Sequence, residues 1–477
     1  MLLDSPGNDG CPDSKNIYGN FRFGIVKRCP AGNLLRMHRR SLLKLSLAAS
    51  ALAVLPKVIS SAQAKDGAAK SAAPLPDIKL SADQIADKLA KLRARKVRVN
   101  PPNQQILEAL ARFPIPVLLY DLAQVDENVL GYFEAKSDLE LRYAIKSAPN
   151  LRLMQRVAAL GGGFDFASRN ELDLALSTGV KVTKCIYSNT VKQAADIRYA
   201  FEKGVRAFVT DSEHETRKIA KNAPGAFLYV RLSVDGKFSG HPLGDKFGTT
   251  PENAKKLLRL GKELGLVPYG THFHVGTQCI HPEAWIGPAR EACGIFRDLK
   301  KEGIDLQFFD IGGGYPTVFQ SFPVVPGPKE IIGGVVKVLE EELPGWPVRL
   351  AAEPGRGICG TTAVISSRVM LRADRADGEW LHLDVGLYQG LFEVIDKYVY
   401  DITVMGRDGK PVPFTLCGPT CDSLDTISKG QMLPGDIDEE DLLVFHNAAA
   451  YSEACNTYFN GMAPPAVHYL DEVLDLG

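Results

Sequence analysis

The sequence lacks the features that mark several large classes of protein. Lysine plus arginine and aspartate plus glutamate are balanced at 56 each, so there is no basic excess for nucleic acid and no acidic excess typical of a disordered tail. The nine cysteines of the 477 residues form no CxxC pair and no cluster with histidine at zinc-ligand spacing, which excludes a disulfide scaffold. We expect mostly free thiols, no metal site, no nucleic acid and a small-molecule partner.

Long apolar runs are also missing, and the apolar stretch nearest the N-terminus indicates export rather than anchoring. Residues 37–66 read MHRRSLLKLSLAASALAVLPKVISSAQAKD, with paired arginines, a short alanine-rich run and a small-residue ending. The run is far shorter than the roughly 20 residues that span a bilayer, so we expect no membrane span. RRSLLK is typical of a twin-arginine signal, which exports folded proteins in bacteria.

These features predict the organisation of the N-terminal part. We expect residues 37–64 to be a removable twin-arginine-type signal peptide and Met37 to be the true start, with residues 1–36 a non-native or disordered leader. The mature protein would then be periplasmic. The alternative is a leader with no export role on a cytoplasmic protein.

From about residue 116 the sequence repeats a pattern of short apolar runs followed by helical spacing. The runs include VLLYD, LRYAIK, GFDFAS, KCIYS, AFVTD, FLYVRLS, YGTHFHVG, LQFFDIGGG and VRLAAEPG. About eight such strands with helices between them favour a parallel (β/α)8 barrel over an open sheet. After residue 362 the runs alternate in the manner of β-strands, and helical periodicity becomes scarce. We predict an α/β barrel at 116–362, a C-terminal β domain at 363–477, and at 65–115 a linker with elements that join the β domain.

Polar residues and glycines follow several of these strands, at the barrel end that carries the chemistry. Lys146 ends YAIK, where an isolated lysine would be a solvated cation. FDIGGGYP places three glycines at a strand end, so backbone N–H groups can approach an anion. Arg356 of EPGR can bind phosphate oxygens through two N–H groups. A lysine beside a phosphate site suggests pyridoxal phosphate, whose aldehyde requires an amine.

Seven motifs occur in the order found in a known family: YAIKSAPN, GFDFASRNEL, HFHVGTQ, FDIGGGYP, AAEPGR, CGPTCDSLD and AAAYSEACNTYFNG. Over residues 114–461 the chain resembles the fold-type III pyridoxal-phosphate-dependent amino-acid decarboxylases, and most of all the ornithine and lysine/ornithine decarboxylases. The resemblance implies an alanine-racemase-like (β/α)8 barrel that binds pyridoxal 5'-phosphate and a C-terminal β-sandwich or barrel-like domain. It also implies a head-to-tail homodimer with shared active sites.

The resemblance implies a role for each motif residue. Lys146 would form the Schiff base, and His274 would stack on the cofactor ring. The phosphate would be bound by residues from four motifs: Thr277, Gly312, Gly313, Gly314, Arg356 and Tyr451. Residues near the lysine and ring would be Asp165, Glu171 and Arg231.

Glu353 indicates which type of reaction to expect. A carboxylate against the pyridine nitrogen favours the protonated ring, which is the stronger electron sink. Racemases that share the barrel place an arginine there. We therefore expect decarboxylation rather than racemisation.

CGPTCDSLD could be a redox or metal pair, but no further cysteine or histidine lies nearby at ligand spacing. The resemblance instead makes Cys421 the residue that protonates Cα in the partner subunit's site, with Asp422 binding the distal ammonium of the substrate. A second acid is expected from GLYQGLFEVIDKY, and either Glu393 or Asp396 could supply it. Tyr388 of the same segment would also bind the substrate.

These residues predict a decarboxylase of a basic L-amino acid. The first candidate is L-ornithine to putrescine, for polyamine biosynthesis, and the second is L-lysine to cadaverine. The chain-length preference stays open, because Gln389 stands where the family commonly has glycine or alanine. The alternatives are an exported racemase or diaminopimelate decarboxylase on the same fold, and an inactive homologue that binds the cofactor.

Overall fold

The computed structural model describes residues 75–76, 78–114, 116–241 and 246–474. The predicted leader at 1–36 and the predicted signal at 37–64 lie outside these residues. All described residues belong to one compact unit, Ala69–Gly477. Within them, no helix combines the length and the apolar character needed to cross a membrane.

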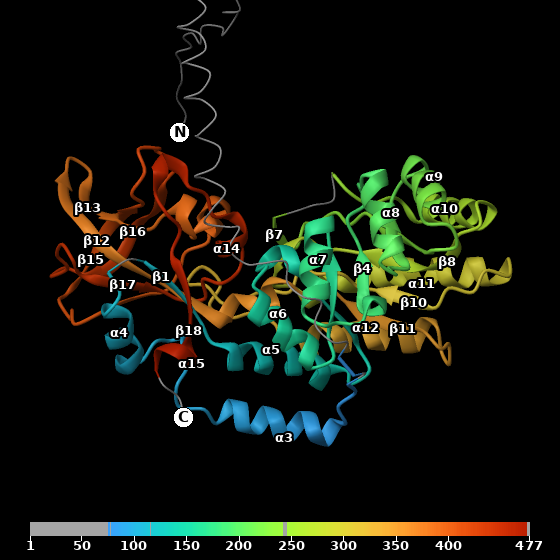
Figure 1. The fold of residues 1–477 in the computed structure, drawn as a ribbon, viewed down its shortest axis with the longest axis horizontal. Helices are drawn as coiled ribbons and strands as arrows, with labels where there is room; N and C mark the ends of the chain where they lie inside the picture. The colour runs from blue at the N-terminus through green and yellow to red at the C-terminus, as the bar shows by residue number, and fades with distance from the viewer. Residues whose placement is uncertain (1–74, 77, 115, 242–245, 475–477) are drawn as a thin grey trace, which may run out of the picture. The chain divides into compact units, whose positions relative to one another are not determined.

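Eight strands close into a barrel in the order β10-β11-β2-β3-β4-β5-β6-β8 (Figure 1). Every neighbouring pair of these strands is parallel. The strands are β2 (Glu140–Ala144), β3 (Gly163–Phe166), β4 (Cys185–Tyr187), β5 (Ala207–Thr210), β6 (Phe227–Leu232), β8 (Val267–Phe273), β10 (Phe308–Asp310) and β11 (Arg349–Ala352). This confirms the predicted fold class, a closed α/β barrel.

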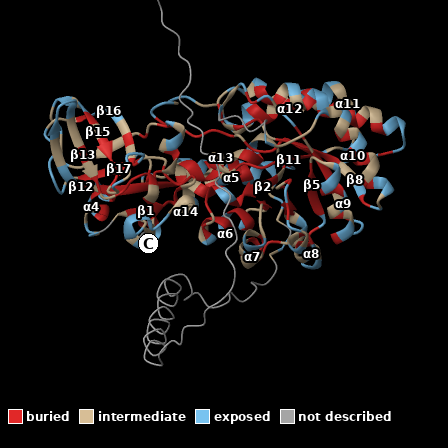
Figure 2. Cartoon of the chain, turned by 90° about the horizontal axis from the view of Figure 1, so that it is seen from above, coloured by how far each residue is buried: buried red, intermediate tan, exposed pale blue. Residues whose placement is uncertain are grey.

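Helices alternate with the barrel strands and cover the outside of the barrel. They are α5 (Leu122–Ala135), α6 (Leu151–Ala159), α7 (Arg169–Ser177), α8 (Ala194–Glu202), α9 (Glu213–Asn222), α10 (Pro251–Glu263), α11 (Ile286–Lys301) and α12 (Pro328–Glu342). Several begin at a residue whose side chain accepts a backbone N–H, such as Asn150 before α6 and Ser212 before α9. Their inward faces are buried (Figure 2).

The barrel interior is filled by alternate residues of its strands. Ile186, Val209, Tyr229, Phe308 and Ala351 come from five different strands and form one buried cluster. The rings of Tyr229 and Phe308 meet edge to face at 5.1 Å. Since period-two geometry sends the intervening residues outward, the barrel is a packed core and only its rim is available for chemistry.

The C-terminal part forms a separate eight-stranded sheet. Its main path is β14 (Ile402–Val404), β17 (Leu442–Phe445), β12 (Ala363–Arg375), β13 (Gly378–Leu383), β15 (Pro411–Cys417) and β16 (Thr426–Pro434). The strands β1 (Val117–Tyr120) and β18 (Ala466–Tyr469) complete it, because β1 pairs with both β12 and β18. The prediction that placed VLLYD in the barrel is therefore wrong: this segment joins the C-terminal sheet.

Shorter elements complete the described residues. The helices α3 (Ala82–Arg93) and α4 (Gln104–Ala111) precede β1, and α13 (Arg356–Cys359), α14 (Ser452–Cys455) and α15 (Leu470–Val473) are single turns. Two further strands, β7 (Ser239–His241) and β9 (Thr277–Cys279), pair beside the barrel rim.

Candidate active site

Lys146 lies on a single 3-10 turn, η1 (Ile145–Ser147), directly after β2. Its Nζ is 3.6 Å from Oδ2 of Asp165, the last residue but one of the neighbouring strand β3. The Lys146 side chain is 49% exposed, so its amine reaches the open space at the rim. Burial lowers the pKa of Lys146, but the charges of Asp165, Tyr451 and Glu353 raise it more, and the net direction is upward.

The carboxylate of Asp165 is held in place from the next strand. Ser188 donates a hydrogen bond from Oγ to Oδ1 of Asp165, which leaves Oδ2 for Lys146. Glu171, in the first turn of α7, accepts a 2.6 Å hydrogen bond from the backbone N–H of Ala167, and burial raises the pKa of this carboxyl. The structure thus brings Lys146 and Asp165 together as predicted, while Glu171 supports the loop that follows β3.

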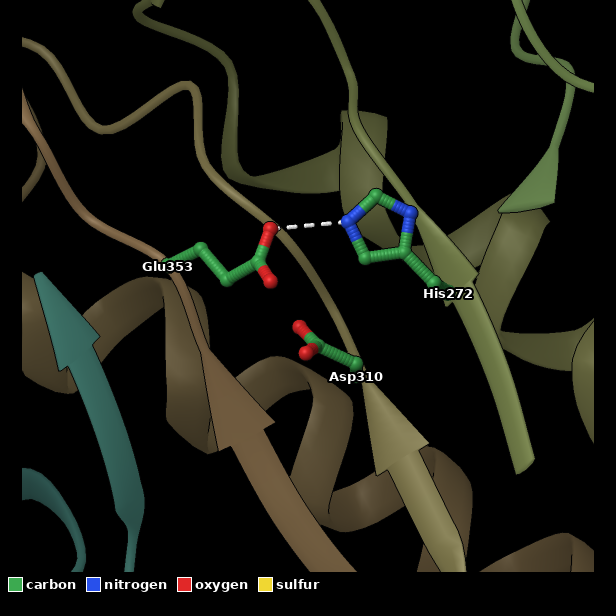
Figure 3. A group of neighbouring side chains, drawn as sticks. All are labelled: His272, Asp310 and Glu353. Atoms are coloured by element: carbon green, nitrogen blue, oxygen red, sulfur yellow. Dashed lines mark hydrogen bonds and ion pairs between the residues drawn. The ribbon is translucent and has the colours of Figure 1, made fainter. Parts of the chain in front are cut away.

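Glu353 follows β11 and meets two buried side chains from β8 and β10 (Figure 3). Nε2 of His272 lies 2.8 Å from Oε2 of Glu353. Asp310 is the register partner of His272 across the β8–β10 pair, so strand pairing places its carboxyl beside the other two. Burial raises the pKa of Glu353, raises that of Asp310 to about 8, and lowers the pKa of His272 to about 4.

His274 is half-buried just after β8. Its Nδ1 accepts a 3.0 Å hydrogen bond from the backbone N–H of Gly276, which places the ring proton on Nε2. Burial, followed by the positive charge of Arg231, holds the pKa of His274 well below its usual value. The ring is therefore neutral, as suits a flat surface for stacking. Arg231 is the last residue but one of β6, with its guanidinium 5.1 Å from the ring centre of Phe247.

The glycines after β10 form a cradle that side chains would fill. Gly312 and Gly314 have φ of 62° and 104°. A Cβ on Gly312 would overlap the carbonyl oxygen of Phe273, and one on Gly314 would lie 2.6 Å from that of Gly276. Only glycine combines this backbone conformation with so close an approach. The Gly312 N–H is taken by Oδ1 of Asp310, while the lack of side chains on Gly313 and Gly314 lets an anion approach their backbone closely.

Arg356 supplies the positive charge beside this cradle. Its Nη2 donates a 3.0 Å hydrogen bond to Oγ1 of Thr277, and its guanidinium lies 5.1 Å from the ring centre of Tyr451. The backbone N–H of Tyr451 donates to the carbonyl of Ser147 at 2.6 Å, which ties the C-terminal part to the lysine turn. Among the described residues, the buried Nε of Arg356 has no hydrogen-bond partner. The cradle and this unpartnered donor fit a phosphate group.

The two acids predicted in GLYQGLFEVIDKY have different surroundings, although both lie on the 3-10 segment η6 (Phe392–Asp396). Glu393 is buried and forms an ion pair with Arg356. Asp396 is half-buried at the end of the segment. The structure thus places Glu393 at the anion cradle, and its predicted contact with a substrate ammonium stays a prediction.

Cys421 and Asp422 lie on the loop between β15 and β16. Tyr388, on the 3-10 turn η5 (Leu387–Gln389), donates a 2.6 Å hydrogen bond from its hydroxyl to Oδ2 of Asp422. This hydrogen bond lowers the pKa of Asp422. Cys421 is exposed, with Nδ2 of Asn460 3.3 Å from its Sγ. The structure therefore joins two predicted substrate-binding residues and leaves the thiol accessible.

Two buried members of the site, His272 and Asp310, were not predicted from sequence. The motif HFHVG could have indicated His272, because residues 272 and 274 are two positions apart and residues at that spacing face the same side of a strand. Asp310 begins the glycine motif, and its Oδ1 accepts the backbone N–H of Gly312 at 2.9 Å.

Comparison with known proteins agrees with this geometry. Residues 122–360 match the family model described as pyridoxal-dependent decarboxylase, pyridoxal binding domain. A lysine/ornithine decarboxylase of Selenomonas ruminantium is 31% identical over 75% of this chain and 90% of its own length. Antizyme inhibitor 2 of Xenopus laevis is 29% identical over 73% of this chain and 79% of its own length.

A solved structure shows the same fold. The lysine/ornithine decarboxylase of Vibrio vulnificus complexed with putrescine has a TM-score of 0.71 and 29% identity, and the match covers 78% of this chain and 99% of that one. The cradle, the lysine and the unpartnered Arg356 donor fit the cofactor that the matched family model names. This chain therefore belongs to the pyridoxal-dependent decarboxylases, and its cofactor is pyridoxal phosphate.

Proposed function

We propose that the protein decarboxylates a basic L-amino acid, with L-ornithine as the first candidate and L-lysine as the second, to give putrescine or cadaverine. The observation that carries the proposal is the placement of the Lys146 amine 3.6 Å from Asp165 at the barrel rim, with the buried Glu353 directly after a strand of the same barrel. The relative from Selenomonas ruminantium is a lysine/ornithine decarboxylase, and the Vibrio vulnificus protein was solved with putrescine and with cadaverine.

Pyridoxal phosphate, when bound, supplies an aldehyde that condenses with amines and a ring that withdraws electrons from a neighbouring carbon. Lys146 would hold the aldehyde end, and Arg356 with Thr277 would hold the phosphate. Glu353 would hold a proton on the ring nitrogen, which favours loss of carbon dioxide from the substrate. His274 offers a neutral, half-buried ring for stacking.

The distal end of the substrate would meet carboxylates. Asp422 is ionised at neutral pH, since the Tyr388 hydroxyl holds its pKa below the usual value. An ionised carboxylate recognises an ammonium by a charge-assisted hydrogen bond. An aspartate at position 422 fits a substrate with a simple cationic tail. Diaminopimelate decarboxylases of this family usually have glutamate at that position. We assign the second acid to Asp396, because Glu393 already pairs with Arg356.

We also propose that two subunits share each active site. Cys421 contacts the side-chain amide of Asn460, and Asp422 accepts a hydrogen bond from Tyr388. None of these four residues belongs to the phosphate cradle. Large apolar side chains next to this loop are exposed, with Leu424 at 68% and Tyr458 at 62%. Such exposed apolar groups favour an interface. In a head-to-tail dimer the Cys421 thiol of one subunit would return a proton to Cα in its partner's site.

Export remains a separate proposal that rests on the sequence alone. We propose that residues 37–64 direct the protein to the periplasm. Cell fractionation with N-terminal sequencing of the mature chain tests it. A full-length cytoplasmic protein that retains residues 1–64 would contradict it.

One relative favours a second candidate function. Antizyme inhibitor 2 raises the alternative of a homologue that binds a protein and has no activity. The lysine, the cradle, Arg356 and Cys421 are all present in this chain, which supports an active enzyme. An arginine in place of Glu353 would have favoured a racemase.

A product screen tests the proposed function. Purified protein with cofactor is incubated with ornithine, lysine, arginine and diaminopimelate, and the products are separated by chiral chromatography. We expect putrescine or cadaverine as the main product. A D-amino acid, lysine from diaminopimelate, or no product despite bound cofactor would each contradict the proposal.

A further inference from the structure

His272 and Glu353 are joined by a buried hydrogen bond that engages only one oxygen of the carboxylate. The side chains are 1% and 3% exposed, and Nε2 of His272 lies 2.8 Å from Oε2 of Glu353. The other oxygen, Oε1, has no hydrogen-bond partner among the described residues. A buried carboxylate oxygen without a donor is costly, so Oε1 points to a donor that the chain itself does not supply.

Asp310 faces the same carboxylate from a third strand (Figure 3). Its Oδ1 accepts the Gly312 N–H, while its Oδ2 has no partner among the described residues. Burial, followed by the negative charge of Glu353, raises the pKa of Asp310, while burial, followed by the charge of Asp165, raises the pKa of Glu353. The pair therefore holds a proton at neutral pH unless a cation lies beside it.

The tautomer of His272 decides where the protons lie. Burial lowers the pKa of His272 to about 4, so the ring is neutral and carries one proton. With that proton on Nε2, His272 donates to an ionised Glu353. With it on Nδ1, Nε2 accepts from a protonated Glu353. Only the first arrangement leaves Glu353 negatively charged, so that its Oε1 can form a charge-paired hydrogen bond with a protonated ring nitrogen.

We propose that His272 is a positioning residue for the cofactor: its Nε2–H holds Oε2 of Glu353, so that Oε1 meets the ring nitrogen of pyridoxal phosphate. The inference rests on the proposed role of Glu353 toward that nitrogen. Asp310, the third member of this buried group, carries the one proton that the carboxyl groups of Asp310 and Glu353 hold between them. Without His272, Oε2 of Glu353 would be buried without a donor, which favours a protonated Glu353, and the ring nitrogen would lose the negative charge that keeps it protonated.

The test uses the holoenzyme reconstituted with pyridoxal phosphate that carries ¹⁵N in the ring, measured by NMR at neutral pH. We expect a protonated, hydrogen-bonded ring nitrogen in the wild type. His272→Phe keeps a flat ring but removes the donor, so the resonance should move toward that of an unprotonated pyridine. We also expect kcat to fall by about tenfold to a hundredfold while KM changes little, because a hydrogen bond to a charged group is lost.

Two further variants complete the test. His272→Asn can still donate to Glu353 and should restore part of the protonated signal. His446→Phe removes a histidine of the C-terminal sheet whose Nε2 lies 2.8 Å from the Thr403 hydroxyl, and it should leave the signal unchanged. If His272→Phe does not fold, the ¹⁵N spectrum of His272→Asn tests whether the side chain at position 272 controls protonation of the ring nitrogen.

Three outcomes would overturn the inference: an unprotonated ring nitrogen in the wild type, an unchanged resonance in His272→Phe, or zinc that binds the cofactor-free protein tightly through these side chains. The last is the competing role, because ligand atoms of His272, Asp310 and Glu353 lie within 4.8 Å of one another. The NMR signal requires bound cofactor but no turnover. Failure of the substrate assignment would therefore show in the product screen and leave this test intact.

Discussion

The hydroxyl of Tyr388 donates a 2.6 Å hydrogen bond to Oδ2 of Asp422. Asp425 fixes the two segments that carry this pair, since its Oδ1 accepts the backbone N–H of Leu387 and its Oδ2 accepts that of Thr420. The carboxylate proposed to bind the substrate's ammonium is thus held in a set direction and kept ionised.

The Tyr388–Asp422 pair predicts a defect in substrate binding. Tyr388→Phe should raise KM for the diamino acid by about threefold to tenfold with a smaller change in kcat, because one hydrogen bond orients the half-buried carboxylate of Asp422. Asp422→Asn should raise KM further. Steady-state kinetics checks both. Tyr199→Phe, which removes a similar tyrosine–aspartate hydrogen bond to Asp173 on the surface, should have no effect. An unchanged KM in Asp422→Asn would contradict the assignment.

Sharing of active sites between subunits predicts complementation. Lys146→Ala and Cys421→Ala should each be inactive or nearly so as homodimers. Mixed in equal amounts and allowed to exchange subunits, they should recover about a quarter of wild-type activity, since half of the dimers are mixed and each has one intact site. Activity that stays at the sum of the two variants would show that Cys421 acts within its own subunit or not at all.

The surroundings of Glu393 and Asp396 predict different defects. Glu393→Gln should change the affinity for pyridoxal phosphate, because Glu393 pairs with Arg356, while KM for the amino acid stays within about twofold. Asp396→Asn should raise KM for the amino acid and leave the affinity for pyridoxal phosphate unchanged. Titration of the cofactor by absorbance, beside steady-state kinetics, separates the two. A raised KM in Glu393→Gln with unchanged cofactor affinity would return Glu393 to the substrate.

Lys192 predicts a pH dependence of stability. Its Nζ is buried, lies 3.1 Å from Oε1 of Glu215 and donates to the carbonyl of Val209 at 2.6 Å. Burial lowers its pKa to about 8. The unfolded chain keeps a pKa of about 10.4, so between these values the unfolded state binds more protons and stability rises with pH.

Wild type should therefore gain about 1–3 kcal/mol over Lys192→Met as the pH rises from about 7.5 to about 10. Urea unfolding at the two pH values measures the difference. Lys218→Met is the matched control, since Lys218 pairs with the same Glu215 at 2.6 Å but is partly exposed. A constant difference between wild type and Lys192→Met would contradict the lowered pKa.

Most of the barrel could be predicted because its strands are short, apolar and regularly separated by helices. The exception was β1, whose VLLY has the same character as a barrel strand. Its place is decided by pairing with β12 and β18, far along the chain, and no local pattern reports such pairing. Local periodicity gives the element, but the sheet that it joins depends on tertiary contacts.

Within the site, the motifs predicted the residues that face the rim but not the buried residues His272 and Asp310. Lys146 and Arg356 stand in sequence contexts that already suggest an amine and a phosphate site. The contact of His272 with Glu353 depends on three strands and on the register that sets Asp310 opposite His272. The ion pair of Glu393 with Arg356 likewise joins two domains, and neither residue's local sequence indicates it.

Release of labelled carbon dioxide from ornithine and lysine carrying ¹⁴C in the carboxyl group tests the central claim most directly. The wild type should release it and form the diamine, and borohydride should fix the cofactor to the peptide that contains Lys146. Lys146→Ala should lose both, while Lys91→Ala, which removes an exposed lysine of α3, should retain both. Carbon dioxide release that persists undiminished in Lys146→Ala, or its absence from wild type with bound cofactor, would contradict the account.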